Sequence, residues 1–288
     1  MQVNTKLLLV LFGGLLTAVV QADESEWLGA EAPKHSLGVR VGADTENQTL
    51  AGADLQLGLP NYSQIALAYS ATSVDDDGAA ADSRHWLAAF TTDPIAKWSL
   101  AAEYRSAVEE STLETRDWEF QAQYYPGSWL LRVGFITGQV EADNPFDGVR
   151  GRDFRDPEFD RLGLSLLYSG YAGNWRLDLS GVTYDYEENI PEQIGNRRLT
   201  LYMAQRTLSG LLDLTDHRLG MAINYQRNNW AYQVGVSQYQ YAITEEKENS
   251  LSAGVTYYLS DTFSWSAFAA GGLEDNIYYG ESALRFHW

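Results

Sequence analysis

The sequence lacks cysteine, has few basic residues and contains only one long apolar run. Without cysteine no disulfide can form, so the fold itself must supply the stability. The 20 Lys and Arg residues are outnumbered by 39 Asp and Glu residues. The lack of a basic cluster argues against nucleic acid as a partner. Beyond the N-terminus no apolar run approaches the ~20 residues of a membrane-spanning helix.

The apolar run at the N-terminus predicts a secretory signal peptide. It extends from Leu7 to Val20 behind Lys6, and Val20 and Ala22 suit a cut after Ala22. Its roughly 14 residues are too few for a membrane anchor. We therefore expect cleavage of residues 1–22, a periplasmic N-terminal segment at 23–34 and a folded domain at 35–288. Removing Lys6 leaves 19 basic and 39 acidic side chains, a net charge of 19 − 39 = −20.

The rest of the chain alternates between apolar and polar residues with a period of two. In "HSLGVRVGA", Leu37, Val39 and Val41 alternate with glycine and arginine, and "DWEFQAQYY" repeats the scheme with Trp118 and Phe120. Comparable segments continue to the C-terminus. Strict alternation over about 8 to 10 residues predicts strands with one apolar and one polar face. The domain is therefore predicted to be all-β.

The composition of the polar face favours a transmembrane barrel over a soluble sandwich. In a sandwich the apolar faces form the core, whereas in a transmembrane barrel they contact lipid. The polar faces here consist largely of Gly, Ser, Ala, Gln, Glu and Arg, and Lys is almost absent from the strands. Small residues mixed with a few charges suit the interior of a barrel.

The expected connections alternate in length, as in barrels with short periplasmic turns and longer extracellular loops. Short links are expected at 60–61, 93–97, 126–128, 226–229 and 260–262. Longer, acidic loops are expected at 72–83, 108–116, 139–160 and 244–250. Tryptophan directly follows a short turn at Trp98, Trp129, Trp175 and Trp230. One rim of the barrel should therefore carry a ring of indoles at the level of the lipid headgroups.

Alternation and loop rhythm together predict fourteen strands, an even number that suits a closed barrel. They are expected at 36–43, 50–59, 63–71, 84–92, 98–107, 117–125, 129–138, 161–168, 175–184, 217–226, 230–240, 250–259, 263–270 and 277–288. The segment 196–216 is ambiguous, because Leu199, Leu201 and Met203 alternate like a strand while Leu199, Tyr202 and Met203 could face one side of a loop helix. A hairpin there would raise the number to sixteen. The 288 − 22 = 266 residues of the mature chain favour fourteen.

The signal peptide, the alternating strands and the ending "LRFHW" resemble porin-like outer-membrane β-barrel proteins of Gram-negative bacteria. The resemblance covers the mature chain and concerns its architecture. It implies contact with outer-membrane lipids and lipopolysaccharide, and recognition of the last strand by the barrel-assembly machinery. The residues that match this assembly signal are Gly280, Leu284, Phe286 and Trp288. Trp288 departs from the Phe that commonly ends the strand.

The parity of the strands predicts which side chains face the lumen. The predicted pore-lining residues are Arg40, Asp54, Gln56, Glu103, Arg105, Glu119, Gln121, Arg132, Arg176, Asp178, Arg218, Glu281 and Arg285. Six are basic and five are acidic, so this set is nearly neutral. We expect the arginines and carboxylates to pair across strands or to meet water, because an isolated charge beside a low-dielectric wall is costly. Such charges set the selectivity of a pore or, alternatively, fill a closed lumen.

The longest expected loop, 138–160, is the candidate for a constriction. Its candidate residues are Arg150, Arg152, Asp153, Arg155 and Glu158. The sequence "PEF" at 157–159 is similar to a Pro-Glu-Phe element in the constriction loop of trimeric general porins, although Asp160 follows it instead of glycine. An acidic, solvent-facing loop is the alternative. Neither this loop nor "DDDG" at 75–78 has the spacing of an EF-hand, so we predict no metal and no cofactor.

These features predict a non-enzymatic outer-membrane porin, a passive diffusion channel for small hydrophilic solutes that weakly prefers cations. One alternative is a barrel hydrolase of the protease or lipase type. His217 follows Asp216, but Thr215 occupies the position that the Asp-x-His pair of outer-membrane aspartyl proteases would need. The other alternative is a structural or adhesive barrel with acidic loops. The sequence does not define the oligomeric state.

Overall fold

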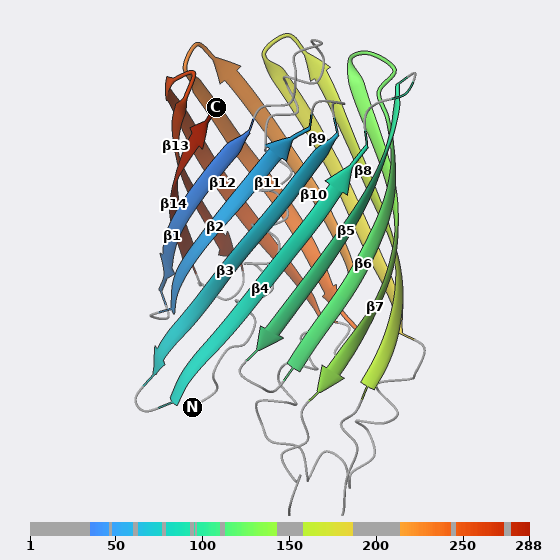
Figure 1. Ribbon diagram of the computed structural model, residues 1–288. Coiled ribbons are helices and arrows are strands. Elements are labelled where there is room, and N and C mark those ends of the chain that lie inside the picture. Colours follow the sequence, from blue (N-terminus) through green and yellow to red (C-terminus); the bar gives the residue numbers. More distant parts are fainter. Residues whose placement is uncertain are drawn as a thin grey trace, which may run out of the picture.

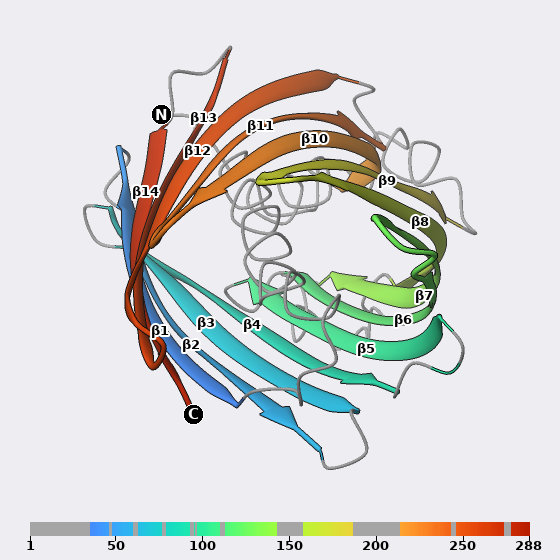
Figure 2. The ribbon, with the colours of Figure 1, turned by 90° about the horizontal axis from the view of Figure 1, so that it is seen from above.

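The computed structural model describes residues 35–45, 48–59, 63–76, 79–92, 95, 97–109, 113–142, 158–186, 214–242, 246–273 and 278–288. They form a closed antiparallel β-barrel (Figure 1, Figure 2). Its strands are β1 (Ser36–Asp44), β2 (Gln48–Gly58), β3 (Gln64–Asp76), β4 (Ala79–Thr91), β5 (Trp98–Glu109), β6 (Leu113–Tyr124), β7 (Trp129–Ala142), β8 (Glu158–Ala172), β9 (Trp175–Tyr186), β10 (Thr215–Arg227), β11 (Trp230–Tyr241), β12 (Lys247–Ser260), β13 (Phe263–Gly272) and β14 (Tyr278–His287). Within these ranges, no helix is long and apolar enough to cross a membrane.

Each strand pairs with its neighbours in sequence, and β1 pairs with β14 to close the barrel. The prediction of fourteen strands is confirmed. The alternative of sixteen strands is wrong, because β9 pairs directly with β10 and leaves no place in the wall for another hairpin. The choice between hairpin and loop helix for 196–216 concerns residues outside the described ranges, except for 214–216, of which Thr215 and Asp216 begin β10.

The outer face of the wall is apolar, as expected for a barrel in lipid. In β1 the side chains of Leu37, Val39 and Val41 are 46%, 53% and 62% exposed, and they alternate with the buried Ser36 and Arg40. The same alternation continues around the barrel with exposed Leu, Val, Phe and Trp residues. So many large exposed apolar side chains on one continuous surface would be unfavourable in water. The transmembrane barrel is therefore the correct interpretation of the alternation.

The tryptophans that follow the short turns lie on one rim and pack against tyrosines of neighbouring strands. Trp98, Trp129, Trp175 and Trp230 each open a strand. The ring centroids of Trp98 and Tyr124 are 4.5 Å apart, and the pairs Trp175–Tyr225 and Trp230–Tyr257 are separated by 4.4 and 4.5 Å. Such aromatic pairs stabilise by more than their buried area. The predicted ring of indoles is present on this rim.

At the opposite rim the strands extend into stretches that were expected to be loops. The hairpin of β3 and β4 leaves only residues 77–78 between the strands, and that of β5 and β6 leaves 110–112. Backbone pairing continues here beyond the apolar belt, where water faces both sides and the alternation that marks a strand disappears. β8 begins at Glu158, which is exposed beside the buried Phe159. Glu158 therefore belongs to β8 and not to the expected loop 138–160, its part in a constriction stays a prediction, and the other four constriction candidates lie outside the described residues.

Candidate functional site

The thirteen residues predicted to line the lumen all lie on the inner face of the wall. Along each strand they alternate with the apolar residues of the outer face, and their side chains are buried or half-buried. Their part in conduction remains a prediction. The structure shows how these charged groups are accommodated, which the sequence left open.

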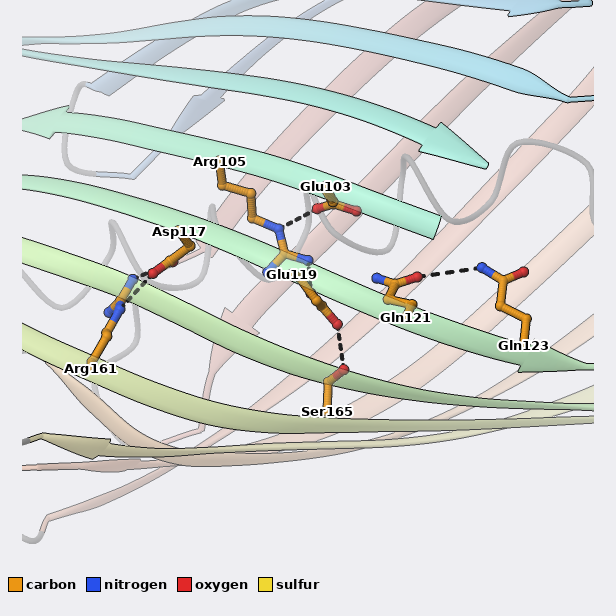
Figure 3. A network of polar contacts seen from close by, with 8 residues as sticks. All are labelled: Glu103, Arg105, Asp117, Glu119, Gln121, Gln123, Arg161 and Ser165. Atoms are coloured by element: carbon orange, nitrogen blue, oxygen red, sulfur yellow. Dashed lines mark hydrogen bonds and ion pairs between the residues drawn. The ribbon is translucent and has the colours of Figure 1, made fainter. Parts of the chain in front are cut away.

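Arg105 on β5 binds two carboxylates at once (Figure 3). Its Nε donates to Glu103 on the same strand, and its Nη2 donates to Glu119 on β6. Glu103 and Glu119 lie directly opposite each other in the strand register, where two like charges repel. Arg105 offsets this repulsion, and the hydroxyl of Ser165 on β8 donates a further hydrogen bond to Glu119.

Arg161 on β8 and Asp117 on β6 form a bidentate ion pair across the intervening strand (Figure 3). The distances are 2.8 Å from Nε to Oδ1 and 2.5 Å from Nη2 to Oδ2. Gly138 of β7 lies opposite both residues in the register. A Cβ atom at Gly138 would stand 1.9 Å from Oδ1 of Asp117. The ion pair therefore lies flat against the wall only because the residue between its partners has no side chain.

A second ion pair has the same construction on the other side of the barrel. Arg285 on β14 and Asp54 on β2 are joined by a 3.0 Å contact between Nη2 and Oδ2. Gly38 of β1 lies opposite both, and a Cβ atom there would stand 2.5 Å from Oδ1 of Asp54. We call each such set, an arginine, the glycine it crosses and the residue beyond, a triplet.

The remaining polar contacts of the inner face also follow the wall. Nε of Arg176 lies 3.0 Å from Oδ2 of Asp178 on the same strand, and the same oxygen accepts a 2.7 Å hydrogen bond from Asn224 of β10. Tyr279 donates to Glu281 at 2.7 Å. The inner-face side-chain contacts described here join residues on the same strand or on strands at most two apart. The expectation that arginines and carboxylates pair is confirmed for these groups.

The sequence analysis missed one arginine and three carboxylates of the inner face. Arg161 and Asp117 were placed at strand ends, where strand parity already assigns them to the inner face. Asp44 and Glu248 were placed outside the strands, although parity carried one and two residues further, respectively, assigns them to the inner face as well. Including them raises the described charges of the inner face from six to 6 + 1 = 7 arginines and from five to 5 + 3 = 8 carboxylates. The wall remains close to neutral.

The acid and histidine considered for catalysis lie together at the start of β10. Nδ1 of His217 is 3.2 Å from Oδ2 of Asp216, and both side chains are about one third exposed. Within the described ranges, no Ser or Thr hydroxyl makes a hydrogen bond with His217. Among the described residues, the pair therefore has no hydroxyl nucleophile of the kind that a hydrolytic triad requires.

Comparison with known proteins identifies the fold and nothing narrower. No protein-family model matches the sequence, and no curated protein matches it. CdiB from Acinetobacter baumannii is similar in structure, with a TM-score of 0.50 and 10% identity over 88% of this chain and 60% of that chain. Omp33 from Acinetobacter baumannii has a TM-score of 0.49 and 9% identity over 90% of this chain and 100% of that chain.

The KdgM porin in complex with disordered oligogalacturonate has a TM-score of 0.45 and 6% identity over 88% of this chain and 99% of that chain. At such identities the likeness concerns the fold alone. The closed antiparallel barrel with its apolar outer face, a fold shared with CdiB, makes the chain a transmembrane β-barrel.

Proposed function

We propose that this protein is an outer-membrane channel for the passive diffusion of small hydrophilic solutes. The observation that carries the proposal is the polar inner face, on which the described ion pairs follow the wall. Barrels of eight strands are filled by side chains, whereas those of sixteen to eighteen strands enclose wide channels. A barrel of fourteen strands is intermediate in width. Because its described ion pairs lie along the wall, we infer a narrow aqueous path through its centre.

The proposal includes a residence and a route of assembly. The apolar belt contacts the lipids of the outer membrane, and the rim beyond it meets lipopolysaccharide. The barrel-assembly machinery inserts the protein after removal of residues 1–22, with Gly280, Leu284, Phe286 and Trp288 as the signal in β14. Leu284 and Phe286 are 52% and 38% exposed on the outer face, which supports their availability to a partner.

A weak preference for cations follows from charge. The inner face is nearly neutral, while the whole sequence carries a formal charge of −19, so most of the acidic excess lies elsewhere. Acidic groups around a channel raise the local concentration of cations. The effect is modest in salt, because exposed charges are screened beyond about 8 Å at physiological ionic strength.

Conductance of the purified protein in planar bilayers tests the function. We expect stable, ohmic current steps in KCl, and a reversal potential in a KCl gradient whose sign shows K⁺ preference. Glu119→Gln removes an inner carboxylate and should shift the reversal potential toward chloride. Glu158→Gln removes an exposed acid on the outer face and is the matched control; because exposed charges are screened, it should shift the reversal potential much less. A closed bilayer together with hydrolysis abolished by His217→Ala would contradict the channel.

A further inference from the structure

A third triplet on the inner face has the arginine and the glycine but no acid. Arg40 of β1 lies opposite Gly52 of β2, which in turn lies opposite Ser70 of β3. A Cβ atom at Gly52 would stand 2.7 Å from Nε of Arg40, so here the arginine itself lies over the glycine, whereas in the two triplets with an acid the aspartate carboxylate does. Where those triplets present an aspartate, this one presents the hydroxyl of Ser70.

The consequence is a buried guanidinium edge without a partner among the described residues. Nε and Nη2 of Arg40 are buried and make no hydrogen bond, and the side chain of Arg40 is only 5% exposed. The same two nitrogens of Arg161 hold both oxygens of Asp117. The hydroxyl oxygens of Ser70 and Thr72, which are 0% and 2% exposed, also lack partners there. Buried polar groups of native proteins are normally paired.

The described carboxylates nearest to Arg40 in the register are bound to other groups. Asp54, beyond Gly38, pairs with Arg285, and Glu281 accepts from the hydroxyl of Tyr279. Oδ1 of Asp44 accepts from the backbone of Gln48. His85 lies opposite Ser70, and its ring nitrogen is 3.3 Å from the hydroxyl of Ser83. A histidine side chain is neutral or positively charged, so it cannot balance the charge of Arg40. No built-in acid therefore matches Arg40 within the described part of the barrel.

We propose that Arg40, Gly52 and Ser70 form a binding subsite for the carboxylate of a small solute. A carboxylate presents two coplanar oxygens that match the Nε and Nη2 donors of arginine, and such charge-assisted pairs are among the stronger hydrogen bonds. Ser70 and Thr72 add hydroxyl donors beside it. The solute carboxylate thus supplies the negative charge that Asp117 and Asp54 supply in the complete triplets. The subsite deepens the proposed function, on which it rests because the solute reaches it through the lumen.

Binding of acetate to the purified full-length barrel in detergent tests the subsite without requiring conductance. Carboxyl-labelled acetate is titrated at constant chloride, and its ¹³C line width reports binding. We expect saturable broadening with the unmodified protein and affinity weakened about tenfold or more by Arg40→Gln, as expected on losing a charged pair. The matched control is Arg84→Gln on the exposed face of β4, which changes the net charge equally and should bind acetate normally.

Ser70→Asp supplies the missing acid and is the decisive variant. It should complete the triplet, remove acetate binding and raise the thermal stability of the barrel. If Arg40→Gln does not fold, the acetate titration of Ser70→Asp by itself tests the subsite. Absent binding to the unmodified protein, or equal binding by all folded variants, would overturn the subsite. A closed bilayer with Arg40-dependent acetate binding would overturn the channel and leave the subsite standing, so the two failures are distinguishable.

Discussion

Replacing Gly138 with alanine should separate the ion pair that crosses it. The new Cβ atom would lie 1.9 Å from Oδ1 of Asp117 and 2.7 Å from the backbone oxygen of Arg116. An ordinary contact needs at least 3.4 Å, so the carboxylate must move by about 3.4 − 1.9 = 1.5 Å. Such a movement breaks the 2.8 Å hydrogen bond from Nε of Arg161.

The size of the loss follows from burial. Asp117 and Arg161 are only 5% and 8% exposed, and separating a buried ion pair costs about 3–5 kcal/mol, because it leaves uncompensated charges. We expect Gly138→Ala to lower the free energy of unfolding by about 3 kcal/mol or more. Urea unfolding of the purified barrel, followed by its heat-modifiable mobility on gels, measures the change.

Two comparisons make the measurement specific. Gly181→Ala is the control, because its Cβ atom would meet Leu219 at 3.4 Å, an ordinary contact. The loss caused by Gly138→Ala should shrink in an Asp117→Ala background, where the clashing carboxylate is gone. If Gly138→Ala unfolds like the unmodified protein, or if its effect is fully additive with Asp117→Ala, the glycine does not control the ion pair.

Two further predictions concern the ion pairs and the last strand. Arg161→Ala should lower the free energy of unfolding by about 3–5 kcal/mol, because it leaves a buried carboxylate unpaired. The side chain of Arg116 is 47% exposed in its ion pair with a neighbouring glutamate, so Arg116→Ala should lower it by about 1 kcal/mol or less. Equal losses in urea unfolding would contradict the argument that burial sets the size of the effect. Replacing Phe286 and Trp288 together with serine should reduce the yield of heat-modifiable barrel in cell envelopes, while the barrel that does form should bind acetate normally. Unimpaired assembly of this double variant would show that these aromatic residues are not part of the assembly signal.

Strand number and the two faces of the wall could be predicted because lipid imposes a period of two on the outer residues. Leu37, Val39 and Val41 must all be apolar, and this fixes Arg40 inward without any knowledge of its contacts. The apolar/polar alternation is imposed only on the part of each strand that contacts lipid, so it does not mark the parts that extend beyond the membrane. For this reason the outer parts of β3 and β4 were taken as a loop, and Glu158 was assigned to a loop when it begins β8.

The pairing of inner charges could not be predicted from alternation. Arg161 and Asp117 are 44 residues apart in the sequence, and their contact depends on the register of two hairpins. Gly138 permits this contact, but nothing in the sequence distinguishes it from the other small residues of the inner face. Alternation locates a side chain on a face, whereas the register determines which partner it meets.

The closing of β1 on β14 has a consequence for the order of folding. Of the fourteen pairings among the described strands, thirteen join strands that are adjacent in the sequence. The remaining one pairs β1 with β14 and joins Ser36 to His287, 287 − 36 = 251 residues away. The entropy of closing a chain grows with the logarithm of its length, so neighbouring hairpins should form before this pairing. The sheet then grows as a curved ribbon with two open edges, and a single late step joins them. Variants that weaken the β1–β14 pairing should therefore accumulate as open sheets, in which backbone donors and acceptors along both edges are free to pair with other chains.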